Sequence, residues 1–178
     1  MKLNFKSSKD FVDQNSRYMD ILYQTEKELF DNKKKHLGKI NNLLNTLEIP
    51  NGYIIEAGVW QGDIYKIFQT YFGHHRCIGF DIEKYINDSS IIYGDFRKIH
   101  TQYNFKCSLF FNGLGAWKYN RSSKQSGLDY ATKNLVIGGY YLDTNINNDS
   151  HTMPPACFDK VITDNKFFLV YKKVTEYA

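Results

Sequence analysis

The stretch Ile54–Asp63 reads IIEAGVWQGD, and the fold class of the chain depends on it. Tyr53–Ala57 is a short apolar run, which is typical of a strand buried on both faces of a parallel sheet. Gly58 permits a tight turn and lets a ligand approach the backbone, and Gly62 lets the loop pass close to a helix that begins at Asp63. The stretch therefore predicts a strand, a glycine loop and a helix, and ligands of open parallel sheets bind outside such strand ends.

The rest of the chain alternates between strand and helix patterns. Residues 10–47 show helical periodicity and end at the breaker Ile49–Gly52, so we expect an N-terminal helical extension over residues 1–50 and one domain over residues 51–178. Alternation predicts an α/β fold, with a mostly parallel sheet of six or seven strands and helices on both faces. The expected helices are Asp63–Phe72, Leu128–Asn134 and Ala156–Asp164. The expected later strands are Arg76–Phe80, Ser90–Tyr93, Cys107–Phe111, Gly139–Leu142 and Lys166–Val174.

Acidic residues follow three successive strands of this pattern. Glu56 lies at the end of the first, Asp81 at the end of the second and Asp95 at the end of the third. Asp81 follows the loop by roughly 20 residues, the spacing at which a carboxylate binds ribose hydroxyls. The loop reads GxxxG rather than the dinucleotide pattern GxGxxG, and the carboxylates of Glu56 and Asp63 on either side of it would repel a phosphate. This arrangement favours a sulfonium nucleoside that carries an amino group over a nicotinamide dinucleotide.

Each of these residues also has a structural interpretation. Gly58 and Gly62 alone could be turn glycines, Asp81 and Asp95 alone could be helix caps, and Phe96 could belong to the core. The joint occurrence of three acids at successive strand ends and a glycine loop favours a nucleoside site.

Three motifs, EAGVWQGD at Glu56–Asp63, GFDIE at Gly79–Glu83 and YGDF at Tyr93–Phe96, occur in this order. They resemble the class I S-adenosylmethionine-dependent methyltransferases, and the resemblance covers roughly Tyr53–Val174. The wording GVWxG, with a later aromatic residue, leucine and glycine pair in Tyr130–Gly139, looks most like the macrocin-O-methyltransferase-type branch, whose characterised members methylate sugar hydroxyls. The resemblance implies a Rossmann-like methyltransferase fold with S-adenosyl-L-methionine as the cofactor.

The resemblance also implies roles for individual residues. Glu56, Gly58 and Gly62 would surround the methionine part of the cofactor, and Trp60 and Gln61 would shape the loop beside it. Asp81 would bind the ribose and Asp95 the adenine amino group. The remaining expected cofactor contacts are Ile82 and Phe96 on the adenine faces, and Asn112 after the fourth strand.

Metal binding and proton transfer are where the sequence departs from that branch. Branch relatives hold a divalent metal with an Asp after the fourth strand and an Asp pair after the fifth. This chain has Asn112 and then Asp143-Thr144-Asn145, and a single carboxylate is a poor site for Mg²⁺, so we predict no metal site. A hydroxyl acceptor would then need a base, for which Asp143 and the loop residue His151 are the predicted catalytic residues. His100 and Tyr119 are further candidates, and a lone loop histidine is more often a surface residue.

Composition narrows the partners of the chain. The 178 residues include 23 Lys and Arg against 19 Asp and Glu, a net charge of +4. The one basic cluster, Lys33–Lys35 with Lys39, fits a solvated helix face, so we do not expect a nucleic-acid partner. No apolar run approaches the roughly 20 residues that cross a bilayer, and Met1–Asp10 lacks the apolar region of a signal peptide. Three widely spaced cysteines indicate reduced thiols and a cytoplasmic protein.

We therefore expect a methyltransferase that acts on an oxygen of a small molecule or glycan, and homo-oligomerisation stays open. One alternative is a catalytically inactive or regulatory S-adenosylmethionine-binding protein of the same fold, which the asparagine at position 112 motivates. A second is a nucleotide-sugar or nicotinamide enzyme on a similar sheet.

Overall fold

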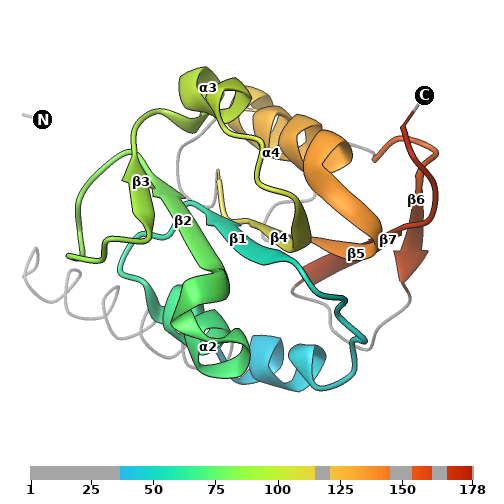
Figure 1. Ribbon diagram of the computed structural model, residues 1–178, viewed down its shortest axis with the longest axis horizontal. Coiled ribbons are helices and arrows are strands. Elements are labelled where there is room, and N and C mark those ends of the chain that lie inside the picture. Colours follow the sequence, from blue (N-terminus) through green and yellow to red (C-terminus); the bar gives the residue numbers. More distant parts are fainter. Residues whose placement is uncertain (1–36, 115–120, 145–153, 162–167, 178) are drawn as a thin grey trace, which may run out of the picture. The chain divides into compact units, whose positions relative to one another are not determined.

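The computed structural model describes residues 37–114, 121–144, 154–161 and 168–177. The chain divides into two compact units, residues 1–38 and residues 39–178. The second unit contains the sheet and its covering helices (Figure 1). Residues 37–44 are helical, and the predicted extension before them lies outside the described residues. Among the described helices, none has the length and apolar character that a membrane crossing requires.

A seven-stranded sheet in the order β3-β2-β1-β4-β5-β7-β6 organises the second unit. The first five strands pair in parallel, β7 runs antiparallel to β5, and β6 runs antiparallel to β7. This mostly parallel sheet confirms the predicted fold class. The strands are β1 (Tyr53–Ala57), β2 (Cys77–Asp81), β3 (Ile91–Tyr93), β4 (Cys107–Asn112), β5 (Leu135–Thr144), β6 (Phe158–Val161) and β7 (Phe168–Lys173).

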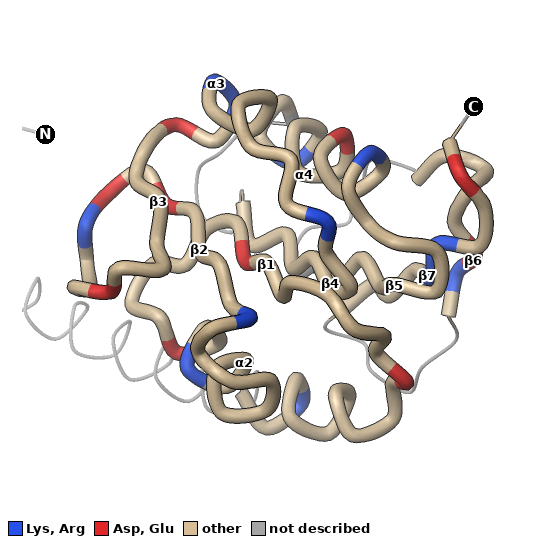
Figure 2. Tube along the Cα trace, viewed as in Figure 1, with Lys and Arg blue, Asp and Glu red and all other residues tan. Residues whose placement is uncertain are grey.

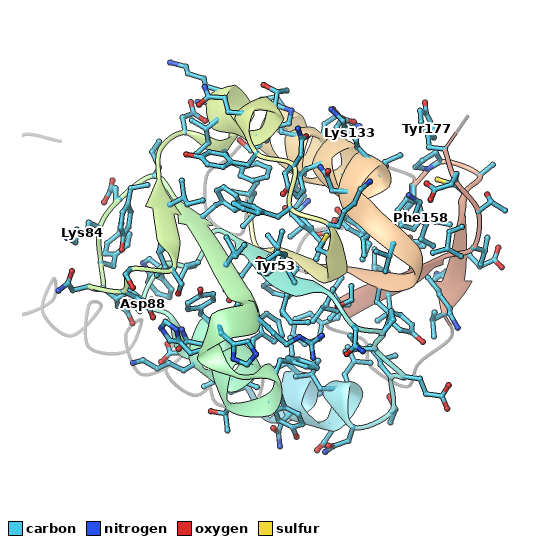
Figure 3. All side chains as sticks on the ribbon, viewed as in Figure 1. Tyr53, Lys84, Asp88, Lys133, Phe158 and Tyr177 are labelled. Carbon is cyan, nitrogen blue, oxygen red and sulfur yellow. The ribbon has the colours of Figure 1, made fainter. Side chains whose placement is uncertain are left out.

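Helices cover both faces of the sheet, as Figure 1 shows. On one face, α2 (Asp63–Phe72) and the helical residues 39–44 pack in a core that includes Phe68, Leu109 and Val170. On the other face, α3 (Phe96–Ile99) and α4 (Arg121–Asn134) pack in a core of mostly aromatic side chains. Two short 3₁₀ turns connect helices to the strands that follow them: η1 (His74–Arg76) lies between α2 and β2, and η2 (His100–Gln102) lies between α3 and β4. Figure 3 shows that side chains fill the space between the sheet and the helices on both faces. Phe158 of β6 is labelled among the side chains of the C-terminal strands.

The carboxyl ends of the parallel strands lie level with one another. Ala57 of β1 pairs with Phe80 of β2 on one side and with Asn112 of β4 on the other, and Asn112 pairs in turn with Asp143 of β5. Strands are about 4.8 Å apart, so Asp143 lies roughly 10 Å from the end of β1 along this row. The ends of β2 and β5 are three strand spacings apart, about 14 Å, so a ligand of nucleoside size at β1 and β2 does not cover the end of β5.

The structure confirms most predicted elements and corrects two. β1 and α2 have the predicted bounds, whereas α4 begins at Arg121, seven residues before the expected Leu128. The predicted helix Ala156–Asp164 is wrong, because Phe158–Val161 is the edge strand β6. Its spacing of Phe158, Val161 and Ile162 imitates a helical face, but backbone pairing with β7 extends the segment instead.

Candidate functional site

The glycine loop after β1 has the backbone conformation that the sequence predicts. Gly58 and Gly62 have φ values of 87° and 77°, in the left-handed region that favours glycine, and Trp60 joins them at 49°. Gly58 donates its N–H to Phe80 O at 2.8 Å, which ties the loop to β2. A Cβ on Gly58 would lie 3.0 Å from the carbonyl carbon of Gly113, the residue after β4. The missing side chain at Gly58 therefore permits contact between the two loops at the strand ends.

Asp81 holds the glycine loop in place from the end of β2. Its Oδ2 accepts the backbone N–H of Trp60 at 2.5 Å, and its Oδ1 accepts that of Glu83 at 3.0 Å. Asp81 is 8% exposed, so it is buried. A carboxylate oxygen has two acceptor positions, so each oxygen can accept one further hydrogen bond, as a ribose diol would require.

Glu56 is the most unusual buried group at this edge. It is 2% exposed, and within the described residues its Oε2 is buried without a hydrogen-bond partner. Burial raises the pKa of Glu56 well above its ordinary value, and the nearby carboxylates of Asp81 and Asp63 raise it further. A buried polar atom without a partner is destabilising, because it loses water and gains nothing in return. An ammonium group beside Oε2 would satisfy this atom and favour the ionised carboxyl.

The side chains around the loop form an exposed rim. Trp60 and Ile82 are 44% and 45% exposed, and Gln61 is exposed as well. Asp63 begins α2, where a carboxylate interacts favourably with the helix N-terminus. Exposed apolar side chains beside a buried carboxylate can cover the flat face of a ligand, which suits the predicted contact of Ile82 with an adenine ring.

Asp95 and Phe96 are held by interactions of their own. Asp95 caps α3 by accepting the N–H of Arg97 at 3.2 Å, and it pairs with the Arg97 guanidinium at 2.6 Å. The hydrogen bond from the Arg97 side chain is the main cause that lowers the pKa of Asp95. Phe96 is 4% exposed, and its ring packs against Phe80 and Tyr130 in the core. The structural interpretation of both residues is thus confirmed, and their contact with adenine stays a prediction.

A buried polar cluster lies at the carboxyl ends of β4 and β5, on the α4 face. Lys124 Nζ lies 2.6 Å from Asp143 Oδ1, and both residues are at most 3% exposed. Asn112 Nδ2 donates to Lys124 O at 3.0 Å and contacts the Tyr141 hydroxyl at 2.8 Å. The Tyr141 hydroxyl is 3.4 Å from Asp143 Oδ2, and burial raises the pKa of Tyr141. Two predicted site residues, Asn112 and Asp143, are therefore brought together.

Other candidates do not join this cluster or fall outside the described residues. His100 contacts Phe96 O through Nδ1 at 2.9 Å and stacks on the Phe96 ring, so it belongs to the α3 turn. His151 and Tyr119 lie outside the described residues. Within the described ranges, no three His, Cys, Asp or Glu side chains lie close enough to hold a metal ion. Lys and Arg are spread over α2, α3, α4 and the C-terminal strands, as Figure 2 shows.

Lys124 and Tyr141 are the members of the site that sequence reasoning missed. Lys124 lies in the polar run RSSKQSG of α4, where a lysine reads as a solvated residue. Tyr141 lies in an apolar strand pattern, which indicates the core. The one available signal is indirect: Lys124 can reach Asp143 only if the helix begins well before its first apolar residue, Leu128.

Comparisons with known proteins bear on the fold of the chain. No protein-family model matches the chain, and no curated protein sequence does. Among solved structures, the TDP-rhamnose 3′-O-methyltransferase CalS11 of calicheamicin biosynthesis is similar with a TM-score of 0.57 at 12% identity, over 96% of each chain. A magnesium protoporphyrin IX methyltransferase from Synechocystis, solved with bound S-adenosylmethionine, gives 0.55 at 9% identity over 79% of each chain.

A third similar structure is an S-adenosyl-L-methionine methyltransferase from Silicibacter pomeroyi, with a TM-score of 0.52 at 15% identity, over 69% of this chain and 82% of that one. Identities this low relate the chains by fold and leave the activity open. The strand order, the antiparallel β7 and these likenesses together show that the chain has the Rossmann-like fold of the S-adenosylmethionine-dependent methyltransferases.

Proposed function

We propose that the chain binds S-adenosyl-L-methionine at the carboxyl edge of β1 and β2 and transfers its methyl group to an oxygen of a small molecule or sugar. The observation that carries this proposal is the buried Oε2 of Glu56, which has no partner among the described residues. A ligand with an ammonium group removes this deficit, and a ligand with a pyrophosphate would worsen it, since Asp81 and Asp63 add negative charge nearby.

Different residues at the carboxyl ends of β1, β2 and β4 would contact different parts of the cofactor. Glu56 would accept from the amino group, and Asp81 would accept from the ribose hydroxyls while it holds the loop through Trp60. Gly58, Gln61 and Gly62 form the turn beside the methionine part, and Asn112 lies at the β4 end next to it. Ile82, Asp95 and Phe96 would contact the adenine ring. When bound, the cofactor supplies an electrophilic methyl group on a sulfonium sulfur.

Two features support an oxygen acceptor. CalS11, a neighbour that matches this chain over 96% of its length, is a TDP-rhamnose 3′-O-methyltransferase. Asp143 lies at the carboxyl end of β5, where it is paired with Asn112 of β4, which in turn is paired with Ala57 of β1. Its carboxylate can serve as the base that a hydroxyl acceptor requires. His151 stays a second predicted base. Alignment of donor and acceptor by the chain would provide much of the remaining acceleration.

A transfer assay tests the proposal directly. The full chain is incubated with methyl-labelled S-adenosylmethionine and a panel of hydroxyl acceptors that includes TDP-rhamnose, glucose and glycerol, and labelled product is separated from cofactor. We expect label in at least one acceptor. Tight binding of S-adenosylhomocysteine without transfer to any hydroxyl would instead favour the inactive or regulatory binding protein.

A further inference from the structure

The buried cluster at the ends of β4 and β5 is a polar arrangement in a place where apolar packing would suffice. Lys124 and Asp143 are removed from water together with Asn112, next to the aromatic core that includes Phe110 and Leu128. A buried ion pair is seldom the most stable choice, because apolar residues of similar volume often serve as well or better. Stability alone therefore does not account for a lysine here.

The position of the cluster points to the acceptor side of the site. Asp143 follows Ala57 and Asn112 along the row of strand ends, two strands away from the end of β1. Glu56 and Asp81 occupy the β1 and β2 part of the edge, so a ligand held by them leaves the β4 and β5 part for a second molecule. Within the part of the chain that the structure describes, Asp143 is the carboxylate at the carboxyl ends of β4 and β5.

Among the described residues, three titratable groups from three elements lie near Asp143. Lys124 of α4 lies 2.6 Å from Oδ1, and the hydroxyl of Tyr141 of β5 lies 3.4 Å from Oδ2. Tyr171 of β7 is the third titratable group near it, and its pKa is raised by burial and by the charge of Asp143. Tyr141 and Tyr171 are thus neutral at physiological pH. Among these three neighbours of Asp143, Lys124 is the one that carries a positive charge.

We propose that Lys124 is a positioning residue, whose ammonium holds Asp143 ionised and oriented to accept the proton of a neutral hydroxyl acceptor. This inference rests on the proposed function. In the step it serves, the acceptor oxygen bonds to the methyl carbon, the electron pair of the breaking S–C bond goes to sulfur, and the hydroxyl proton goes to Asp143 Oδ2. A carboxylate paired with an ammonium is a weak base, but it suffices because the attacking oxygen becomes strongly acidic as it gains the methyl group.

The pair also indicates the charge of the acceptor. Lys124 and Asp143 carry opposite charges 2.6 Å apart, so the described residues of the cluster have no net charge. An acceptor hydroxyl that is itself uncharged fits this surface without a further buried charge, whereas a phosphate or carboxylate at the reacting position would meet Asp143.

The test compares Lys124→Gln and Lys124→Arg with Lys173→Gln, a matched change in a buried lysine of β7 that contacts the carboxyl end of α4. Asp143 is followed by carbon-13 NMR of proteins labelled in the aspartate carboxyl groups, with its signal assigned from Asp143→Asn. We expect the titration midpoint of Asp143 to rise by about 1–3 pH units in Lys124→Gln, because the buried carboxylate loses the ammonium that lies 2.6 Å from Oδ1. Lys124→Arg and Lys173→Gln should keep the wild-type midpoint.

Activity provides the readout that a purely structural pair would not change. In the labelled transfer assay, Lys124→Gln should lower kcat at least about tenfold, keep the KM for S-adenosylmethionine, and move the acid limb of the pH profile upward with the NMR midpoint. Lys124→Arg should recover most of kcat. An unchanged midpoint, or a Lys124→Gln protein with the wild-type pH profile, overturns the role of Lys124. If the wild-type protein binds S-adenosylhomocysteine but methylates no hydroxyl, the proposed function fails and the role of Lys124 fails with it.

Discussion

Two lysines are buried at opposite ends of α4, and their surroundings differ. Lys173 of β7 is 1% exposed, and its three donors reach Thr132 O at 3.0 Å, Leu135 O at 2.8 Å and Glu176 Oε2 at 3.0 Å. Lys124, at the other end, pairs with a buried carboxylate in the row of strand ends. The first arrangement satisfies the carbonyl groups at a helix C-terminus, which is a structural task. The second keeps a charged pair buried where ligands bind.

The same contrast holds for the two edges of the sheet. Lys173 lies at the amino ends of the parallel strands. Its buried ammonium group uses all three of its donors in hydrogen bonds. The carboxyl edge contains Glu56, whose buried Oε2 has no partner in the described part of the chain. Groups that are incompletely satisfied in the free protein are expected where a ligand completes them, and they reduce stability in exchange for binding.

The largest effect is expected from Glu56→Gln. The substitution removes the charge that would bind the ligand ammonium, so affinity for S-adenosylhomocysteine should fall by about 1.5–3 kcal/mol, or about 10- to 150-fold. The free energy of unfolding at neutral pH should stay the same or rise, because the variant has no buried carboxyl to ionise. Calorimetric titration and urea unfolding measure the two quantities. Glu48→Gln, at an exposed position, is the control, and equal affinities of both variants would contradict the role of Glu56.

Lys173→Met should show the opposite pattern. Two buried carbonyl oxygens lose their donor, so the free energy of unfolding should fall by about 1–3 kcal/mol. Affinity for S-adenosylhomocysteine should not change, since Lys173 is at the amino edge. Lys172→Met, at the neighbouring half-buried position, should be nearly neutral. A loss of affinity in Lys173→Met as large as that in Glu56→Gln would remove the distinction between the edges.

The raised pKa of Glu56 predicts opposite pH dependences for binding and stability. In the free protein the carboxyl holds its proton above the ordinary pKa of 4.5, and the ligand ammonium requires it to be lost. Affinity should therefore increase with pH, by up to about tenfold per pH unit, until Glu56 ionises without ligand.

For stability the sign is reversed. A raised pKa in the folded state stabilises the protein below pH 4.5, and that contribution is lost as pH rises towards the folded value. The free energy of unfolding of the wild type relative to Glu56→Gln should therefore fall over that range. Parallel pH profiles of the two proteins, in either measurement, would show that Glu56 does not titrate as proposed.

The smallest effect is expected from Asp95→Ser. Serine can still cap α3, and the lost ion pair with Arg97 is partly exposed, so stability should change by less than about 1 kcal/mol. If Asp95 accepts from the adenine amino group, affinity for S-adenosylhomocysteine should fall by about 0.5–1.5 kcal/mol. If Asp95→Ser keeps the wild-type affinity for S-adenosylhomocysteine and loses only stability, Asp95 caps α3 and does not contact adenine.

Much of the fold could be predicted from the sequence because its signals are local. The apolar run of β1, the glycine loop and the face of α2 each depend on residues within one element. β6 could not be predicted, since a four-residue edge strand forms only by pairing with β7, and Phe158 and Val161 fit either period. The first turns of α4 were missed for a related reason: a polar helix face is buried there by distant residues of β4 and β5.

The candidate site divides along the same line. Glu56, Asp81 and Asn112 lie at or next to the carboxyl ends of their strands, so their meeting at one end of the sheet is a consequence of the parallel strand directions. The pairing of Lys124 with Asp143 joins residues 19 positions apart and depends on where α4 begins relative to the end of β5, and no local sequence pattern indicates this.

The most direct test of the account is calorimetry of the unmodified chain with S-adenosylhomocysteine and with NAD. The heat is measured in buffers of different ionisation enthalpy, so that protons released on binding are counted. We predict that S-adenosylhomocysteine binds and releases a proton from Glu56, and that NAD does not compete with it. Binding of NAD in preference to S-adenosylhomocysteine would contradict the account.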